Sequence, residues 1–279
     1  MSASPAELLH VALQAAEAGA QVLQRRGNGV LEAENKSSDS DWVTAFDTAA
    51  ERAVRDVIWR SRPHDAITGE EFGTTVPEGQ ASGIRWSVDP LDGTTNFIRN
   101  IVYYATSVAA VDSGGEWLAG VVHAPALDRV YWASKGQGAW VRERGQVREL
   151  HGPVAGRAGA IVGSGFSYHP GQRTHQLGEL GELVAGHGDL RRIGSAALDL
   201  CMVADGTLDA YIERGLNEHD WAAAALIAEE AGAVVRRPVL TSALDGGPDE
   251  HERFSAFTAA GSQAIVERAA ELEARSAAY

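Results

Sequence analysis

The sequence contains a single cysteine, no long apolar run and no excess of positive charge. Because Cys201 stands alone, the chain forms no internal disulfide and has no cysteine-rich zinc or iron–sulfur site. Residues 1–7 have neither the basic start nor the apolar core of a signal peptide. No segment reaches the ~18 apolar residues that a membrane helix needs. We therefore expect a cytoplasmic protein without a membrane-spanning segment.

Acidic residues dominate the charge of the chain. There are 38 Asp and Glu against 24 Lys and Arg, which gives a net charge of −14. Such a chain repels nucleic acid and anionic membranes, whose binding requires Lys and Arg to neutralise phosphates. We expect neither as a partner. A small anionic substrate would bind only where a metal ion reverses the local charge.

Several common catalytic motifs are also missing. The sequence has no G-x-x-x-x-G-K-[ST], G-x-G-x-x-G, G-x-S-x-G or H-E-x-x-H, so nucleotide-binding loops, nucleophile elbows and helical zinc sites lose support. The nine histidines are scattered, and no pair has the spacing of metal ligands. We expect each histidine on the surface or in a satisfied core contact.

Hydrophobic periodicity predicts an α/β fold in two parts. A chain of 279 residues with 44% hydrophobic residues can form one large domain or two interlocked ones. The expected helices span residues 8–23, 47–62, 172–185, 195–204, 220–231 and 262–275, and the expected strands span 84–88, 105–111, 117–123, 129–133, 139–142, 160–163, 190–193, 208–212 and 233–236. The segment 152–159 is rich in Gly, Pro and Ala. It predicts a soft boundary between subdomains at 1–150 and 151–279.

The segment 86–97, W-S-V-D-P-L-D-G-T-T-N-F, carries the clearest chemical pattern. Asp89 and Asp92 follow an apolar strand, Pro90 fixes the backbone between them, and Gly93 allows a tight turn. A helix that begins at Gly93 would direct free N–H groups toward whatever the acids bind. This arrangement suits Mg²⁺ that shares its shell with a substrate phosphate. On spacing alone, a turn in which one acid caps a helix fits equally well.

Two further acidic clusters accompany this segment. Glu70 and Glu71 stand between glycines after a short apolar stretch, and Asp220 stands near the start of an apolar helix. Taken singly, solvated acids explain the first cluster and a plain N-cap at Asp220 explains the second.

Together the three clusters resemble the inositol monophosphatase family. The resemblance rests on the order G-E-E, D-P-x-D-G-T-T-N-F and an acid that opens an Ala-rich helix ending in E-A-G, and it spans residues 36–232. Residues 36–47, the G-S-A-A at 194–197 and the D-A-Y-I-E at 209–213 add to it. It implies a layered αβαβα sandwich, a homodimer, and a lithium-sensitive, Mg²⁺-dependent phosphomonoesterase.

The resemblance also implies roles for individual residues. Glu70, Asp89 and the backbone carbonyl of Leu91 would bind one metal, Asp89 would bridge, and Asp92 and Asp220 would complete a second. A third, looser ion would lie near Glu70. The expected catalytic residues are Asp47, Glu70 and Thr94, and the expected substrate contacts are Lys36, Gly93, Thr94, Thr95, Gly194, Ser195, Ala196 and Glu213.

The expected chemistry is hydrolysis by a metal-activated water. Two Mg²⁺ ions about 3.5–4 Å apart can clamp both ends of an in-line displacement. Thr94 and Asp47 would accept hydrogen bonds from the attacking water or deprotonate it. The loaded acidic cluster would then attract phosphate despite the charge of the chain.

The sequence departs from the family pattern around Asp220. The residue before this acid is usually Trp but is His219 here; the run 222–225 is all Ala where a Gly is common; and Gly232-Ala233 replaces Gly-Gly. Because the acid itself is retained, we expect hydrolytic activity to be retained as well. The identity of the substrate is not determined by the sequence. Inositol 1-phosphate or a similar polyol phosphate leads, and histidinol phosphate, fructose 1,6-bisphosphate and 3′-phosphoadenosine phosphates are the alternatives. A non-catalytic, metal-stabilised binding protein is the alternative of another class.

Overall fold

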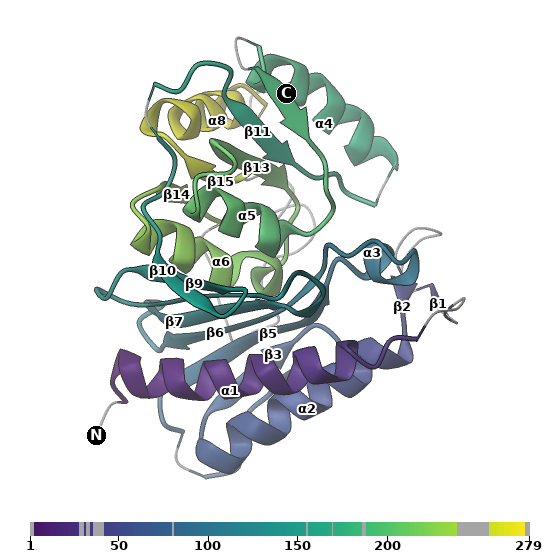
Figure 1. Ribbon diagram of the computed structural model, residues 1–279, viewed down its shortest axis with the longest axis vertical. Coiled ribbons are helices and arrows are strands. Elements are labelled where there is room, and N and C mark those ends of the chain that lie inside the picture. The colour runs from purple at the N-terminus through teal and green to yellow at the C-terminus, as the bar shows by residue number, and fades with distance from the viewer. Residues whose placement is uncertain are drawn as a thin grey trace.

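Helices and sheets alternate in layers along the long axis of the protein (Figure 1). The computed structural model describes residues 3–27, 31, 34–35, 42–79, 81–154, 156–168, 170–185, 188–238 and 257–276. The first layer holds α1 (Pro5–Leu23) and α2 (Ala45–Ser61), which pack on one face of an eight-stranded sheet. Next come α5 (Ala196–Ala204) and α6 (Glu218–Glu230), a five-stranded sheet, and an outer layer of α4 (Pro170–Leu183) and α8 (Gln263–Ser276). The expectation of an αβαβα sandwich is confirmed.

The eight-stranded sheet is antiparallel except where β3 pairs with β5. Its strand order is β10-β9-β8-β7-β6-β5-β3-β4. The strands are β3 (Ala66–Gly69), β4 (Gly73–Thr75), β5 (Ile84–Asp92), β6 (Ala105–Asp112), β7 (Trp117–Ala124), β8 (Arg129–Ser134), β9 (Ala139–Glu143) and β10 (Gln146–Glu149). All nine residues of β5 are buried, because α2 and α6 both contact this strand.

The five-stranded sheet mixes both strand directions. Its order is β12-β11-β13-β15-β14, with parallel pairing of β11 to β12 and β13 and antiparallel pairing of β15 to β13 and β14. The strands are β11 (Ile161–Ser164), β12 (Asp189–Arg191), β13 (Ala210–Arg214), β14 (Val234–Arg236) and β15 (Phe257–Gly261). The described residues also contain a two-stranded antiparallel ribbon, formed by β1 (Glu34–Asn35) and β2 (Trp42–Val43). A short helix α3 (Thr94–Ile98) follows β5, and a 3₁₀ turn η1 (Pro125–Leu127) follows β7.

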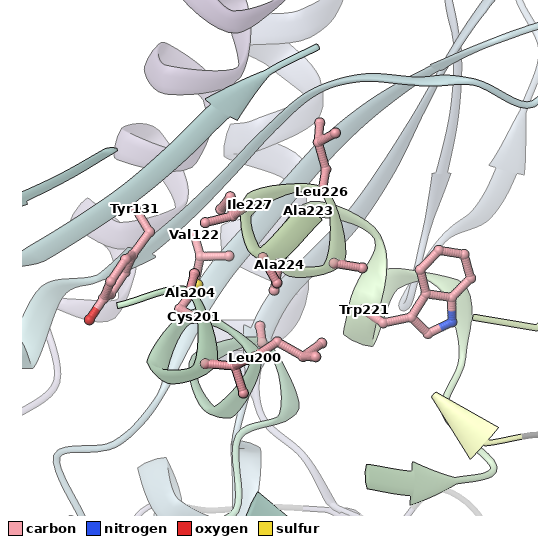
Figure 2. Close-up of a cluster of buried hydrophobic side chains, with 14 of the residues drawn as sticks. Val122, Tyr131, Leu200, Cys201, Ala204, Trp221, Ala223, Ala224, Leu226 and Ile227 are labelled. Atoms are coloured by element: carbon pink, nitrogen blue, oxygen red, sulfur yellow. The ribbon is translucent and has the colours of Figure 1, made fainter. Parts of the chain in front are cut away.

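The main core lies between the eight-stranded sheet and the α5–α6 layer. Figure 2 shows its side chains, among them Val122, Tyr131, Leu200, Cys201, Ala204, Trp221, Ala223, Ala224, Leu226 and Ile227. Gly120 of β7 lets α6 lie close to the sheet, since a Cβ at this position would lie 2.8 Å from the Ala223 carbonyl oxygen. Trp117 and Trp221 pack edge to face with ring centroids 5.6 Å apart.

The structure corrects several sequence-based assignments. We expected the strand to end at Val88, but β5 continues to Asp92, with a shift in pairing register between Asp89 and Asp92. Thr106 of β6 stabilises this irregular stretch by donating to the Pro90 carbonyl at 2.9 Å. The strands β3, β4, β10 and β15 were not expected; each is short and depends on its neighbours. The two-residue strand β1 was not expected either.

No helix in the described ranges is long and apolar enough to span a membrane. The two sheets fall on either side of residue 150. The division of the chain into subdomains there stays a prediction.

Candidate active site

A cavity of about 640 Å³ opens at the end of β5 and the start of α3. The beginnings of α5 and α6 and the end of β13 face it from the other half of the chain. Its lining includes most of the residues singled out from the sequence: Glu70, Asp89, Leu91, Asp92, Gly93, Thr94, Gly194, Ser195, Ala196, Glu213 and Asp220. The fold therefore brings together residues that are up to 150 positions apart.

Buried carboxylates gather on one wall of this cavity. Asp89 is 2% exposed and Asp92 is 7% exposed. Single ligand atoms of Glu70, Asp89 and His219 lie within 4.8 Å of one another. Glu70 directly follows β3, whereas Asp89 and Asp92 lie near the C-terminal end of β5.

Asp220 is not the N-cap of α6. The cap is Asn217, and Asp220 is the third helical residue, whose Oδ2 accepts a hydrogen bond from the Asn217 backbone N–H at 2.6 Å. This reciprocal capping box places the Asp220 carboxylate in the first turn, at the cavity wall. The alternative of a plain N-cap at Asp220 is wrong, because the cap lies three positions earlier.

Thr94 and Asp47 are in contact. The Thr94 hydroxyl lies 3.2 Å from Asp47 Oδ1 and 3.0 Å from the Leu91 carbonyl oxygen, and it can donate to either. Asp47 is fully buried, and its Oδ2 accepts from the Thr44 backbone N–H at 2.8 Å and from the Thr44 hydroxyl at 2.6 Å. One carboxylate oxygen thus caps α2 and the other faces Thr94.

Gly93 makes the turn from β5 into α3. Its φ of +93° is left-handed, and a Cβ there would lie 3.0 Å from the Tyr103 carbonyl oxygen, so the position favours glycine. Asn96 in α3 donates to the carbonyls of Tyr103 at 2.8 Å and Ile193 at 2.9 Å. These bonds join the turn to the loop before Gly194. Thr95, by contrast, is exposed and does not line the cavity.

Ser195 links the start of α5 to the acidic wall. It caps α5, and its hydroxyl donates to Asp92 Oδ2, which also accepts from the Ala197 backbone N–H at 2.8 Å. Asp92 is thereby fixed by a helix start that lies more than 100 residues further along the chain.

Glu213 at the end of β13 also lines the cavity. It is half-buried, and its carboxylate accepts a hydrogen bond from the Tyr211 hydroxyl. Desolvation raises the pKa of Glu213 to about 7, although the Tyr211 hydrogen bond and the Arg192 charge oppose the rise.

Comparison with known proteins decides the family. The sequence pattern of the inositol monophosphatase family matches residues 4–268. The chain belongs to the inositol monophosphatase family. An inositol-1-monophosphatase of Mycobacterium bovis is 43% identical over 258 residues, which is 87% of each chain. A protein named Nus factor SuhB from Escherichia coli is 37% identical over 235 residues, covering 82% of this chain and 84% of that one.

A solved structure agrees with this assignment. The extragenic suppressor protein suhB of Bartonella henselae superposes with a TM-score of 0.80 at 30% identity, covering 95% of this chain and 98% of that one. Inositol monophosphatases are metal-dependent, so the acidic wall has to be tested as a cation site.

The donor set fits a hard dication. Burial, and after it the charges of Glu70, Asp92 and Asp220, raise the pKa of Asp89 well above its usual range. Burial also raises the pKa of Asp92 to about 7, against the lowering effect of the Ser195 hydrogen bond. Repulsion among buried carboxylates is costly without a cation and is relieved by one. Carboxylate and carbonyl oxygens are the ligands that Mg²⁺ prefers.

Glu51 also shapes this site, although the sequence did not single it out. Glu51 in α2 is fully buried; it pairs with Arg55 at 2.7 Å and accepts from the Glu71 backbone N–H at 2.7 Å. It therefore fixes the loop that carries Glu70. A Cβ on Gly69 would overlap the Glu51 carboxylate. Only an acid four residues before Arg55 hinted at this pair, and such spacing is common on solvated helices.

We expected His219, like the other histidines, on the surface or in a satisfied core contact. The structure instead places it beside Glu70 and Asp89. Lys36, the remaining expected substrate contact, lies outside the described residues.

Proposed function

We propose that this protein is a Mg²⁺-dependent phosphomonoesterase that hydrolyses inositol 1-phosphate or a related polyol phosphate. The observation that carries the proposal is the convergence of Glu70, Asp89, Asp92 and Asp220 on one cavity wall, next to the Thr94–Asp47 pair. Membership of the inositol monophosphatase family supports it. The roles of the individual residues are part of the proposal.

Positioning and charge neutralisation carry most of the rate in phosphoryl transfer. Bound Mg²⁺, as two or three ions, would neutralise the phosphate and leaving group and lower the pKa of a bound water. Glu70, Asp89, the Leu91 carbonyl, Asp92 and Asp220 would hold these ions.

The protein's own residues would orient the water. When the Thr94 hydroxyl donates to Asp47 Oδ1, its oxygen lone pairs are left to accept a hydrogen bond from the attacking water. Asp47 is itself held by the cap of α2, so the pair is preorganised. Gly93, Thr94 and Thr95 would contact the phosphate, and Thr95 would do so through its backbone N–H at the start of α3 because its side chain is exposed.

Residues from the second half of the chain would bind the leaving group. Gly194, Ser195, Ala196 and Glu213 would contact substrate hydroxyls, with Lys36 as a further contact. Above its pKa of about 7, Glu213 is anionic and favours a hydroxyl-rich or cationic leaving group, because it would repel a second phosphate. Inositol 1-phosphate therefore leads over fructose 1,6-bisphosphate and 3′-phosphoadenosine phosphates, and histidinol phosphate stays an alternative.

The proposal has a direct test in phosphate release. The panel is inositol 1-phosphate, histidinol phosphate, fructose 1,6-bisphosphate and adenosine 3′,5′-bisphosphate, each with Mg²⁺ and with chelator. The variant is Asp89→Asn, and Asp56→Asn on the exposed face of α2 is the matched control. We expect turnover that needs Mg²⁺, is abolished at position 89 and is kept at position 56. No turnover on any substrate, despite Mg²⁺ binding, would reject the proposal.

A non-catalytic role is the second candidate, because a relative 37% identical to this chain is named a Nus factor. A non-catalytic protein does not need the Thr94–Asp47 pair, whose proposed role is to orient the attacking water. Mg²⁺-dependent phosphate release that falls on substitution of Thr94 would argue against it.

The proposal extends to the assembly and organisation of the chain. We propose a cytoplasmic, lithium-sensitive homodimer. We also keep the division into 1–150 and 151–279: the first part carries Glu70, Asp89 and Asp92, and the second carries Asp220 and Glu213. The 1–150 fragment alone is therefore expected to release no phosphate.

A further inference from the structure

His219 lies within ligand distance of a cation that Glu70 and Asp89 would share. One atom of each side chain falls within 4.8 Å of the other two, which is close enough for a single ion to contact all three. Asp89 is buried, and the His219 side chain is 14% exposed. All three residues line the same cavity.

The first turn of α6 holds His219 in place from both sides. Glu218 forms a paired salt bridge with Arg85, whose Nη2 lies 2.8 Å from Glu218 Oε2. Asp220 closes the capping box with Asn217. Both sequence neighbours of His219 are thus anchored, which fixes the stretch of backbone that carries the imidazole.

The ion pair with Asp220 does not account for the position of the imidazole. His219 Nε2 lies 3.7 Å from Asp220 Oδ1, beyond the usual range of about 2.7–3.2 Å for an N–H···O hydrogen bond. The cluster with Glu70 and Asp89 offers the imidazole a different role.

We propose that His219 is a nitrogen ligand of the cation bound by Glu70 and Asp89. Mg²⁺ takes oxygen ligands, whereas imidazole suits later first-row dications such as Co²⁺ and Zn²⁺. The imidazole would therefore raise the affinity of this position for a transition-metal dication above that of an all-oxygen site. The inference rests on the proposed function only in that the acidic wall binds a cation.

Electron spin-echo measurements on bound Mn²⁺ test the ligand directly. An imidazole nitrogen bound to Mn²⁺ gives ¹⁴N modulation that an oxygen ligand does not give. We expect it in the wild-type protein and its loss in His219→Trp and in His219→Gln, two variants of different size. His123→Gln is the matched control, because His123 is also buried and also lies beside a glutamate, Glu17, at 3.4 Å.

Calorimetric titration with the metals alone tests the selectivity. Loss of His219 should weaken Co²⁺ binding at least about tenfold and change the Mg²⁺ dissociation constant far less. Absent ¹⁴N modulation in the wild type, modulation that survives both substitutions, or equal weakening of Co²⁺ and Mg²⁺ would each overturn the inference. None of these results depends on phosphate release, so failure of the proposed function and failure of this inference can be told apart.

Discussion

Replacement of Asp92 by asparagine is expected to remove activity and to stabilise the metal-free protein. Asp92 is 7% exposed, and its Oδ2 already accepts from Ser195 and Ala197. The asparagine carbonyl can take over both hydrogen bonds, and its amide replaces the carboxylate oxygen Oδ1. The change thus deletes one negative charge from the acidic wall and keeps the contacts with α5.

The magnitude follows from the pKa of Asp92, which lies at about 7 instead of 3.8. At about 1.4 kcal/mol per pKa unit, ionised Asp92 costs the folded state about 4 kcal/mol. The substitution removes this cost, but burial of the polar asparagine amide offsets part of the resulting stabilisation. We expect a net increase in the free energy of unfolding of about 1–3 kcal/mol, or about 2–5 °C in Tm.

The sign of the pH dependence is fixed by the raised pKa. Between pH 3.8 and about 7 the unfolded chain ionises Asp92 while the folded protein keeps it protonated, so wild-type stability falls as the pH rises through this window. The advantage of Asp92→Asn should therefore be fully present at pH 8 and shrink toward pH 4.

The assay is thermal unfolding in chelator at pH 8 and pH 5, with Asp56→Asn as an exposed control that should stay within about 0.5 kcal/mol of the wild type. Added Mg²⁺ should raise the Tm of the wild type more than that of the variant, because a ligand stabilises only the state that binds it and the variant lacks one ligand. A variant no more stable than the wild type in chelator at pH 8 would refute the argument that repulsion and burial strain this site.

Three further substitutions test other parts of the site. Thr94→Val should lower kcat about 10²–10⁴-fold with little change in KM, and Thr94→Ser should restore most of it; a kcat within about threefold of wild type would contradict the water-orienting role. Gly93→Ala should cost about 1–3 kcal/mol in urea unfolding, because its φ is +93° and a Cβ would meet the Tyr103 carbonyl; unchanged stability would count against this reading of the turn. Glu213→Gln should raise phosphate release from fructose 1,6-bisphosphate relative to inositol 1-phosphate, and no change on either substrate would count against the repulsion argument.

The sequence by itself determined the family and most of the candidate site. The segment 86–97 joins two acids, a proline, a glycine and two threonines within one local stretch, and local chemistry of this kind can be interpreted without a structure. The helices α1, α2, α5 and α6 were predicted to within a few residues, because their periodicity and caps are local as well.

The tertiary structure decided what depends on distant partners. The short strands β3 and β15 exist through pairing with β5 and β13, and β5 runs past Pro90 because β6 continues to pair with it.

Long-range contacts also decided the details of the site. The Ser195 hydrogen bond to Asp92, the buried Glu51 beneath the Glu70 loop and the place of His219 beside Glu70 and Asp89 all join residues far apart in the chain. A single sequence specifies which residue types are present. It does not specify which distant side chains the packed layers bring within a few ångströms of each other.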